Sequence, residues 1–366
     1  MIFDSESVFE ENVITVLKQH GWKDGVLRYP TERDLLDNWK GILYRNNNDI
    51  DRLGKYPLTD GEMTQIIEQI ETLRTPLALN SFVNGRTVSI TRDNKEDVAH
   101  FGKEVSLYIY DRKEIAGGKS TYQIAQQPVY PAKNKMLNSR RGDLVLLING
   151  MPLIHIELKK SGIPVSQATN QIEKYAHEGV FTGLFRLVQI FVAMNPDDAV
   201  YFANPGVDKF NPSYYFHWAD YNNEPICGGQ NPGKDEWKLF IGGTSGTAGL
   251  LSIPMAHQLI GFYTIADSAD GCLKVLRSYQ YIAANAISDV VRKCDWEQRP
   301  ATPGRPGGYV WHTTGSGKTM TSFKSAQLIA DSHDADKVVF LMDRIELGTQ
   351  SLKESVSYTH LRAHET

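Results

Sequence analysis

The stretch Arg140–Lys160, RRGDLVLLINGMPLIHIELKK, decides how the first half of the chain folds. Two aliphatic runs flank Asn149-Gly150, and Asn-Gly between such runs is the strongest short signal of a β-hairpin. Side chains alternate between the two faces of a strand, so Glu157 and Lys159 share one face. We therefore predict a hairpin whose second strand presents a carboxylate and an ammonium group on the same side.

The length of the hairpin loop decides whether Asp143 joins that face. A two-residue loop would put Asp143 and Glu157 on opposite faces of the sheet. A three-residue loop that includes Met151 sets the two carboxylates opposite each other, and Gly150 can adopt the left-handed conformation that such a loop needs. We expect the three-residue loop, which gathers two carboxylates and one ammonium group on one surface.

Such a cluster has a chemical use. Two carboxylates a few ångströms apart repel each other unless a divalent cation lies between them, and oxygen ligands with room for water suit Mg²⁺. The metal can polarise a phosphoryl oxygen and lower the pKa of a bound water, and a nearby lysine can stabilise developing negative charge. Phosphodiester nucleases need these parts. The alternative is an ordinary ion pair between Glu157 and Lys159 on a solvated hairpin face.

The composition is that of an ordinary globular protein, with 41% hydrophobic and 22% charged residues. A chain of 366 residues is too long for one ordinary core, so two domains are expected. The net charge of −4 means that any DNA contact must come from local clusters such as Arg140-Arg141 and Lys159-Lys160. Three widely spaced cysteines fit a reducing cytoplasm. No apolar run is long enough to cross a bilayer, so we expect a cytoplasmic protein without a membrane partner.

Periodicity predicts helices and strands on either side of the hairpin. An amphipathic helix is expected over 7–22, with Glu10 beside its apolar stripe, a helix and then a loop over 29–57, and a further helix over 63–73. Strands are expected over 87–91, 105–110, 184–194 and 200–204, followed by a loop-rich region over 210–249. These elements predict an α/β fold, a mixed sheet flanked by helices, that ends near residue 255.

A second motif lies in the last quarter of the chain. His312 opens the run HTTGSGKT, between a short apolar strand predicted over 309–311 and a helix over 320–329, with another strand over 337–342. Strand, glycine loop, helix, strand is the setting of a phosphate-binding loop. Backbone N–H groups around Gly315, Ser316 and Gly317 would wrap phosphate oxygens at a helix start.

The last two residues of this run have separate tasks. Lys318 would reach the β- and γ-phosphates of ATP, and the Thr319 hydroxyl would ligate Mg²⁺. His312 departs from the standard pattern, which has glycine there. The form Thr-x-Gly-Ser-Gly-Lys-Thr resembles superfamily 2 helicases and translocases.

Asp143, the hairpin and Glu157-Leu158-Lys159 together resemble the core of PD-(D/E)xK nucleases, with Gly142 where that name has proline. The resemblance implies that Asp143 and Glu157 hold Mg²⁺ and that Lys159 assists catalysis. Downstream, Gln171 and Tyr175 are similar to the Gln-x-x-x-Tyr element of one branch of that superfamily, and their spacing of four places them on one helix face.

Three further places in the chain resemble these families, one the nucleases and two the superfamily 2 motors. In nucleases of this kind a glutamate on the first helix often faces the metal site, which implies Glu10, the alternative being a solvated helix glutamate. Arg277-Ser278-Tyr279-Gln280 resembles the adenine-reading element of superfamily 2 motors. A glutamine amide can pair with N6 and N7 of adenine, which gives a preference for ATP. A glutamine facing water is the alternative. Asp343-Arg344 is similar to a motor segment near the DNA track, where Arg344 either contacts a phosphate or pairs with Asp343.

A nuclease motif followed by a motor motif resembles the restriction (R, motor) subunit of type I restriction-modification enzymes. This resemblance implies an endonuclease domain over 1–255, the first part of a RecA-like domain over 256–356, and a tail over 357–366 that does not match. It implies double-stranded DNA as substrate, Mg²⁺ and ATP as cofactors, and modification (methyltransferase) and specificity subunits as partners. The family's acidic Asp-Glu-x-His motif is absent, so we expect weak ATP binding without turnover. A repair-type nuclease–helicase and a non-catalytic fragment that only docks to subunits or DNA are the alternatives.

Overall fold

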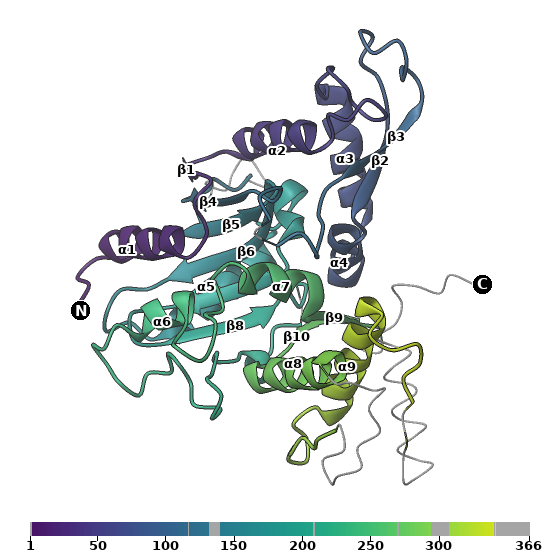
Figure 1. The fold of residues 1–366 in the computed structure, drawn as a ribbon. Coiled ribbons are helices and arrows are strands. Elements are labelled where there is room, and N and C mark those ends of the chain that lie inside the picture. Colours follow the sequence, from purple (N-terminus) through teal and green to yellow (C-terminus); the bar gives the residue numbers. More distant parts are fainter. Residues whose placement is uncertain are drawn as a thin grey trace.

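The computed structural model describes residues 2–115, 117–131, 140–207, 209–268, 271–293, 307–339 and 341. A six-stranded sheet in the order β1-β4-β5-β6-β7-β8 forms the centre of the molecule (Figure 1). Its strands are β1 (Val26–Arg28), β4 (Tyr122–Gln126), β5 (Leu144–Ile148), β6 (Met151–Leu158), β7 (Ile190–Met194) and β8 (Ala199–Ala203). The β1–β4 and β6–β7 pairs are parallel and the other pairs are antiparallel. The predicted mixed sheet is therefore confirmed.

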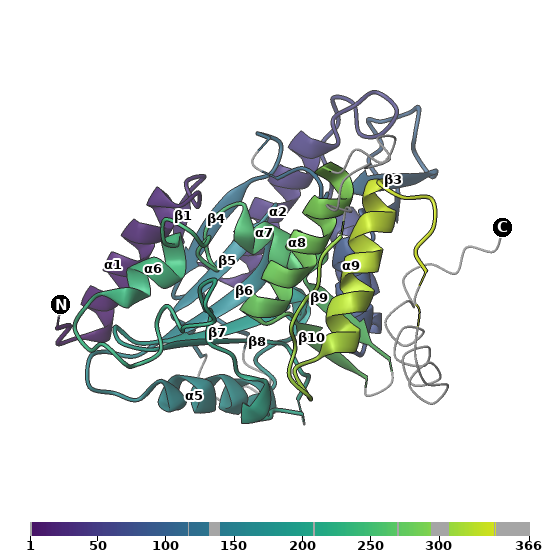
Figure 2. The ribbon, with the colours of Figure 1, turned by 60° about the horizontal axis from the view of Figure 1, so that its bottom comes forward.

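Helices cover both faces of this sheet. The helices are α1 (Glu6–Gln19), α2 (Glu32–Asn46), α3 (Asp60–Thr72), α4 (Pro76–Asn84), α5 (Val165–Glu178), α6 (Glu236–Gly242), α7 (Met255–Phe262), α8 (Ser278–Lys293) and α9 (Lys318–Ser332). Helix α5 lies on one face of the sheet, and α6 and α7 lie over the other (Figure 2). The fold class predicted from the sequence, an α/β sheet flanked by helices, is thus what the structure has.

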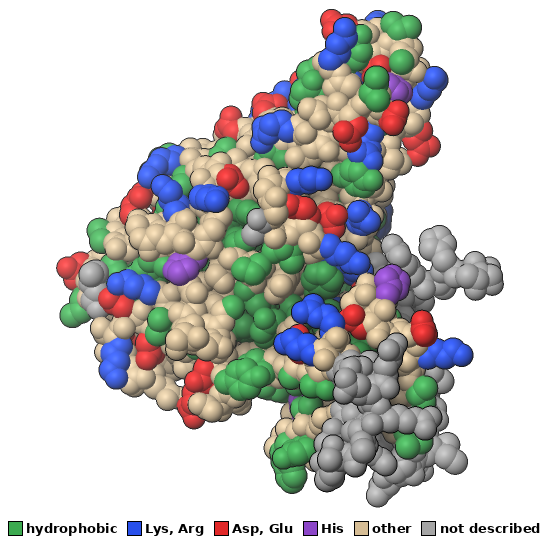
Figure 3. Space-filling view, in the orientation of Figure 1, with side chains coloured by type: hydrophobic (Ala, Val, Ile, Leu, Met, Phe, Trp, Pro, Cys, Tyr) green, Lys and Arg blue, Asp and Glu red, His purple; other side chains and the backbone are tan. Residues whose placement is uncertain are grey.

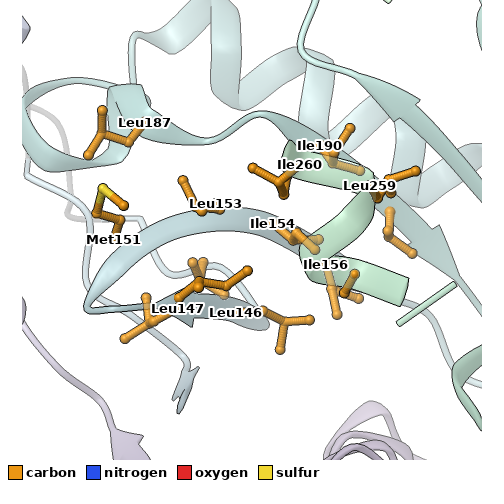
Figure 4. Close-up of a cluster of buried hydrophobic side chains, with 14 of the residues drawn as sticks. Leu146, Leu147, Met151, Leu153, Ile154, Ile156, Leu187, Ile190, Leu259 and Ile260 are labelled. Atoms are coloured by element: carbon orange, nitrogen blue, oxygen red, sulfur yellow. The ribbon is translucent and has the colours of Figure 1, made fainter. Parts of the chain in front are cut away.

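The two faces of β6 and β7 pack against different helices. On the α5 face, Ala168 and Ile172 of the helix join Phe191 of β7 in one buried cluster. On the opposite face, Ile154 and Ile156 of β6 lie close to Leu259 and Ile260 of α7 (Figure 4). Every residue of β5 and β6 is buried, as expected for central strands covered on both sides. Each such aliphatic side chain contributes roughly 1.5–3 kcal/mol through burial.

Two smaller sheets stand apart from the central one. Strands β2 (Thr87–Thr91) and β3 (Glu104–Tyr108) form an antiparallel pair that packs against α3. Strands β9 (Thr264–Asp267) and β10 (Cys272–Val275) form a second antiparallel pair. The predicted strands over 87–91 and 105–110 are therefore present, although they do not extend the central sheet.

Two predicted stretches differ from the structure. The strand expected over 184–194 begins as the 3₁₀ helix η1 (Gly183–Leu187), and only its end forms β7. The first residue of this stretch that pairs with β6 is Ile190, which lies opposite Ile154. The region 210–249 contains a short 3₁₀ turn, η2 (Pro212–Tyr214), and α6 as well as loops.

The strands expected on either side of the glycine loop are not formed by the described residues there, 307–313, 337–339 and 341. A strand needs a neighbour to satisfy its backbone N–H and C=O groups, and no described segment pairs with these stretches. Their apolar side chains are correspondingly open to solvent, with Trp311 88% and Leu341 95% exposed. The helix expected over 320–329 is present as α9. Across the described residues, no helix is both long and apolar enough to traverse a bilayer.

Candidate active site

The hairpin turn has two residues, so the predicted three-residue loop is wrong. Ile148 pairs with Met151, and Asn149 and Gly150 have φ values of 52° and 83°. Positive φ at both central residues is the mark of a type I′ turn, whose twist matches that of the flanking strands. A Cβ on Gly150 would lie 2.9 Å from the backbone Cα of Trp39, so the position requires glycine for two independent reasons.

A β-bulge restores the geometry that the turn alone would have prevented. Leu147 pairs with Pro152, but Leu146 pairs with Ile154, so Leu153 is an extra residue on β6. One extra residue reverses which side chains share a face. Beyond the bulge, Leu144 pairs with Ile156, and one step further along the same register sets Asp143 opposite Glu157.

The Asp143 carboxylate lies against the end of β6. Its Oδ2 accepts a 2.7 Å hydrogen bond from the backbone N–H of Leu158. Lys159 Nζ lies 3.9 Å from Oε1 of Glu157 and 3.5 Å from Oε1 of Glu6 on α1. The sequence-predicted trio of Asp143, Glu157 and Lys159 therefore comes together at one edge of the sheet.

Burial makes this pair of carboxyl groups unusual. Glu157 is fully buried, and among the described residues neither of its carboxylate oxygens has a hydrogen-bond partner. Burial raises the pKa of Glu157 to about 8, although the Lys159 ammonium lowers it. Burial, followed by the charge of Glu157, raises the pKa of Asp143 well above its usual range. Two carboxyl groups that resist ionisation together are the arrangement that a divalent cation stabilises.

The available ligands suit Mg²⁺, which keeps several bound waters, better than a metal that is surrounded by protein ligands alone. No group of three or more His, Cys, Asp and Glu side chains converges as a metal site in the part of the chain that the structure describes. Two carboxylates leave the remaining positions of an octahedral ion to water and phosphate oxygens, as Mg²⁺ prefers. The unpartnered oxygens of Glu157 are the atoms that need such an ion.

Glu10 lies on α1, at the edge of the sheet where β4 ends. It is 3% exposed, so the alternative of a solvated helix glutamate does not describe it. Its carboxylate accepts hydrogen bonds from the side-chain amides of Gln126, at 2.6 Å, and Gln127, at 3.2 Å. Burial raises the pKa of Glu10, and its charge in turn raises the pKa of Asp143 and of Glu157. Glu10 thus belongs to the electrostatic surroundings of the pair.

Gln171 and Tyr175 reach the chain segment just before Asp143 and not the carboxylates themselves. The Gln171 amide donates a 2.7 Å hydrogen bond to the Tyr175 hydroxyl, which donates a 2.9 Å bond to the backbone carbonyl of Arg141. The hydroxyl therefore connects α5 to the segment that carries Asp143 and leads into β5. This contact explains how residues on a helix can support a site on the sheet.

Two residues near the pair have no counterpart in the sequence prediction. His155 precedes Glu157 by two positions on β6 and shares its face, and Tyr130 contacts the His155 ring. A Cβ on Gly142 would lie 2.5 Å from Tyr130 Oη and 2.9 Å from His155 Cε1. The glycine in the place of proline was the available signal, because it marks a close approach of other side chains.

The glycine loop turns into α9 at Lys318. His312 Nδ1 lies 2.9 Å from Ser316 Oγ, which donates a hydrogen bond to the carbonyl of Thr313. Lys318 Nζ contacts the same carbonyl at 3.3 Å. Thr319 follows in the first turn of the helix. The loop thus closes on its own polar groups, with the Lys318 ammonium directed at the Thr313 carbonyl.

The Arg277–Gln280 segment packs against this loop, so Gln280 does not face water. The Gln280 side chain accepts a hydrogen bond from the Arg277 N–H at 3.0 Å and lies 3.4 Å from the Ser316 carbonyl. The Tyr279 hydroxyl donates a 2.8 Å bond to that carbonyl. A cavity of about 220 Å³ opens beside Gln280 and Gly315–Gly317. The Asp343-Arg344 pair and the tail over 357–366 lie outside the described residues.

Basic side chains do not form a continuous band on the face shown in Figure 3, where they are interspersed with acidic ones. Of the two predicted clusters, Arg140 is paired with Glu178 through two 2.8 Å hydrogen bonds. Arg141 and Lys160 are exposed. Contact with DNA near Asp143 would therefore depend on a few exposed basic side chains, such as Arg141 and Lys160.

Comparison with known proteins gives two family matches. A family model described as Type I restriction enzyme R protein N terminus matches residues 4–210, and one described as SWI2/SNF2 ATPase matches residues 279–366. A type I restriction enzyme endonuclease subunit from Staphylococcus saprophyticus is 31% identical over 362 residues, which cover 97% of this chain and 33% of the relative. A second, from Staphylococcus aureus strain MSSA476, is 32% identical over 356 residues with the same coverage.

The EcoprrI endonuclease subunit from Escherichia coli is 26% identical over 321 residues, covering 85% of this chain and 90% of the relative. The chain spans about a third of the length of the two staphylococcal relatives. The match to the R protein model covers more than half of the chain. This chain therefore belongs to the family of type I restriction enzyme R proteins.

Proposed function

We propose that this chain carries the DNA-cleaving centre of a type I restriction endonuclease, built on a PD-(D/E)xK nuclease core. The observation that supports this most directly is the placement of the Asp143 carboxylate at the end of β6, where Glu157 is buried and unpartnered beside Lys159. Burial of charge without hydrogen bonds is costly, so such a pair is expected where a cation completes it. The substrate is double-stranded DNA, and the reaction is hydrolysis of a phosphodiester bond.

Each side chain has a separate task in this proposal. Asp143 and Glu157 would hold Mg²⁺, which would lower the pKa of a bound water and polarise the scissile phosphate. The ammonium of Lys159 stabilises the negative charge that develops on the phosphate. Glu10 adds negative charge beside the pair and so favours cation binding. Gln171 and Tyr175 keep the Asp143 strand in place through the Arg141 carbonyl.

We further propose that residues 312–319 bind the phosphates of ATP. The glycine loop at the start of α9 and the match to an ATPase family model over residues 279–366 support this. Lys318 would contact the β- and γ-phosphates and Thr319 a Mg²⁺ ion. Gln280, with Arg277, would take the adenine in the adjoining cavity. We expect this chain alone to bind ATP weakly and not to turn it over, because the acidic hydrolysis motif is absent from it.

The proposed organisation follows from the two sites. Residues 1–255 would be the endonuclease domain and residues 256–356 the first part of the motor domain. The relatives are endonuclease subunits of type I restriction enzymes. By analogy, this protein would work in the cytoplasm with modification (methyltransferase) and specificity subunits, which supply the recognition of the DNA sequence.

The test uses the full-length protein assembled with its modification and specificity subunits. Asp143→Ala and Lys159→Ala should each abolish Mg²⁺- and ATP-dependent cutting of unmodified plasmid while leaving DNA-stimulated ATP hydrolysis intact. Lys103→Ala is the control for Lys159→Ala, because Lys103 is an exposed lysine outside the predicted DNA-contact clusters. Cutting that survives both Asp143→Ala and Lys159→Ala would overturn the proposed nuclease site.

A further inference from the structure

We propose that Tyr130 and His155 form a relay of polar side chains that fixes the orientation of the Glu157 carboxylate, which makes them positioning residues for the metal site. This inference rests on the proposed nuclease function. His155 is fully buried, with Nδ1 2.8 Å from the Tyr130 hydroxyl and Nε2 3.3 Å from Oε2 of Glu157. The three groups therefore form a continuous series of polar contacts from the loop after β4 to the proposed metal ligand.

The chemistry of the three groups determines the direction of the relay. A neutral imidazole has one N–H, and an ionised carboxylate can only accept. Metal binding requires the ionised form of Glu157. When the Tyr130 hydroxyl donates to Nδ1 of His155, the ring proton is on Nε2 and points at Glu157. The opposite tautomer would direct a lone pair at the carboxylate, so an ionised Glu157 favours the proton on Nε2, and the Tyr130 hydroxyl stabilises that tautomer by donating to Nδ1.

Close packing holds the relay in place. The ring of His155 contacts Phe181 and Phe191, with ring centroids 5.4 and 5.9 Å apart. Tyr130 and His155 also fill the space beside Gly142, where any side chain would collide with both. The relay thus occupies the position next to Asp143 that a larger residue at 142 would take. Because His155 is enclosed on all sides, it has no route to the substrate.

The relay gives the two oxygens of Glu157 different surroundings. Oε2 faces His155, whereas Oε1 lies on the Lys159 side at 3.9 Å. Among the described residues, neither oxygen has a hydrogen-bond partner, and nor has Nε2 of His155, so the 3.3 Å contact between Nε2 and Oε2 is one that an ionised Glu157 would complete. A donor on Oε2 leaves Oε1 as the oxygen directed toward the proposed metal. Hydrogen bonds of this kind to metal ligands commonly change metal affinity by about 10–100-fold.

The test compares His155→Leu and His155→Gln in the full-length protein assembled with its partner subunits. Binding of Mn²⁺, as a calorimetric substitute for Mg²⁺, should weaken at least about tenfold in His155→Leu. The Mg²⁺ concentration needed for half-maximal plasmid cutting should rise in parallel, while ATP hydrolysis stays unchanged. His155→Gln, whose amide can donate at the Nε2 position, should recover most of the affinity. Tyr130→Phe should give a smaller loss, because Nδ1 of His155 then loses the hydrogen bond that stabilises the tautomer with its proton on Nε2.

The chain offers a matched control in His257, another buried histidine whose Nδ1 lies 2.8 Å from a tyrosine hydroxyl, that of Tyr122. His257→Leu removes the same kind of contact away from the carboxylates and should leave Mn²⁺ affinity unchanged. The relay is disproved if His155→Leu and Tyr130→Phe both bind Mn²⁺ as tightly as His257→Leu does. That result leaves the nuclease proposal intact, whereas cutting by Asp143→Ala would remove the nuclease proposal itself. Thermal unfolding of each variant identifies any that fails to fold, and Tyr130→Phe, which keeps all ring atoms, then decides the question.

Discussion

Asp143 and Glu157 face each other because β6 has one residue more than β5 between the turn and the proposed site. The extra residue is Leu153, which is fully buried. The bulge sits between an obligatory two-residue turn and a pair of carboxyl groups that must share a face. The strand register at the site therefore depends on both the turn and the packing of the bulge.

The turn itself supplies the first prediction. Gly150→Ala should destabilise the protein by more than about 2 kcal/mol, because a left-handed alanine costs about 1–2 kcal/mol and its Cβ would also collide with Trp39. Gly102 has a similar φ of 73° but open space around it, so Gly102→Ala should show only the conformational cost. Urea unfolding of both variants measures the difference. Equal losses would mean that contact with Trp39 does not constrain the turn.

The sequence predicted the hairpin and the alternation of Glu157 and Lys159 because both are local properties of a strand and a turn. The bulge was not predictable, since it depends on how Leu153 packs among side chains from other elements. Tyr130 is 25 positions from His155, and no spacing rule connects them. The strands around the glycine loop were predicted from propensity, but a strand also needs a partner to pair with. The sequence therefore predicted features that depend on neighbouring residues, but not those that depend on packing between distant segments.

A second prediction concerns the ion cluster beside β2. The guanidinium of Arg92 has no exposed area and lies 2.6 Å from Glu62 and 3.0 Å from Asp97. Arg92→Met should cost about 3–5 kcal/mol of stability, because two buried carboxylates then lose their partner. Arg33→Met is the control, since Arg33 pairs with Asp37 on the surface and should cost under about 1 kcal/mol. Denaturant titration near pH 7 gives both values, and a loss at Arg92 no larger than at Arg33 would contradict the structure.

A third prediction is a pH effect from His257. Burial lowers the pKa of His257 from 6.5 to about 4, against the weaker opposing effects of Asp111 and Glu114. The unfolded chain therefore binds a proton between pH 6.5 and 4 that the folded chain does not. Stability should fall as the pH is lowered through this window, by roughly 3 kcal/mol in total.

His257→Leu should remove this component of the pH dependence, even if it also lowers stability at pH 7. Urea unfolding of the wild type and the variant at pH 7, 6 and 5 separates the two effects. Parallel curves of stability against pH for the two proteins would show that His257 is not the group responsible.

The last prediction concerns the hydroxyl that joins α5 to the Asp143 strand. Tyr175→Phe removes the hydrogen bonds to Gln171 and to the Arg141 carbonyl and should cost about 1 kcal/mol of stability. If the hydroxyl also holds the Asp143 strand in its working position, plasmid cutting should fall about tenfold or more, since small displacements in a catalytic site are expensive. Tyr110→Phe is the matched control, because the buried Tyr110 hydroxyl likewise donates to a backbone carbonyl, that of His257. Both variants should lose similar stability, and only Tyr175→Phe should lose cutting at unchanged ATP hydrolysis. Equal cutting by the two variants would show that the Tyr175 hydroxyl contributes to stability and not to the position of Asp143.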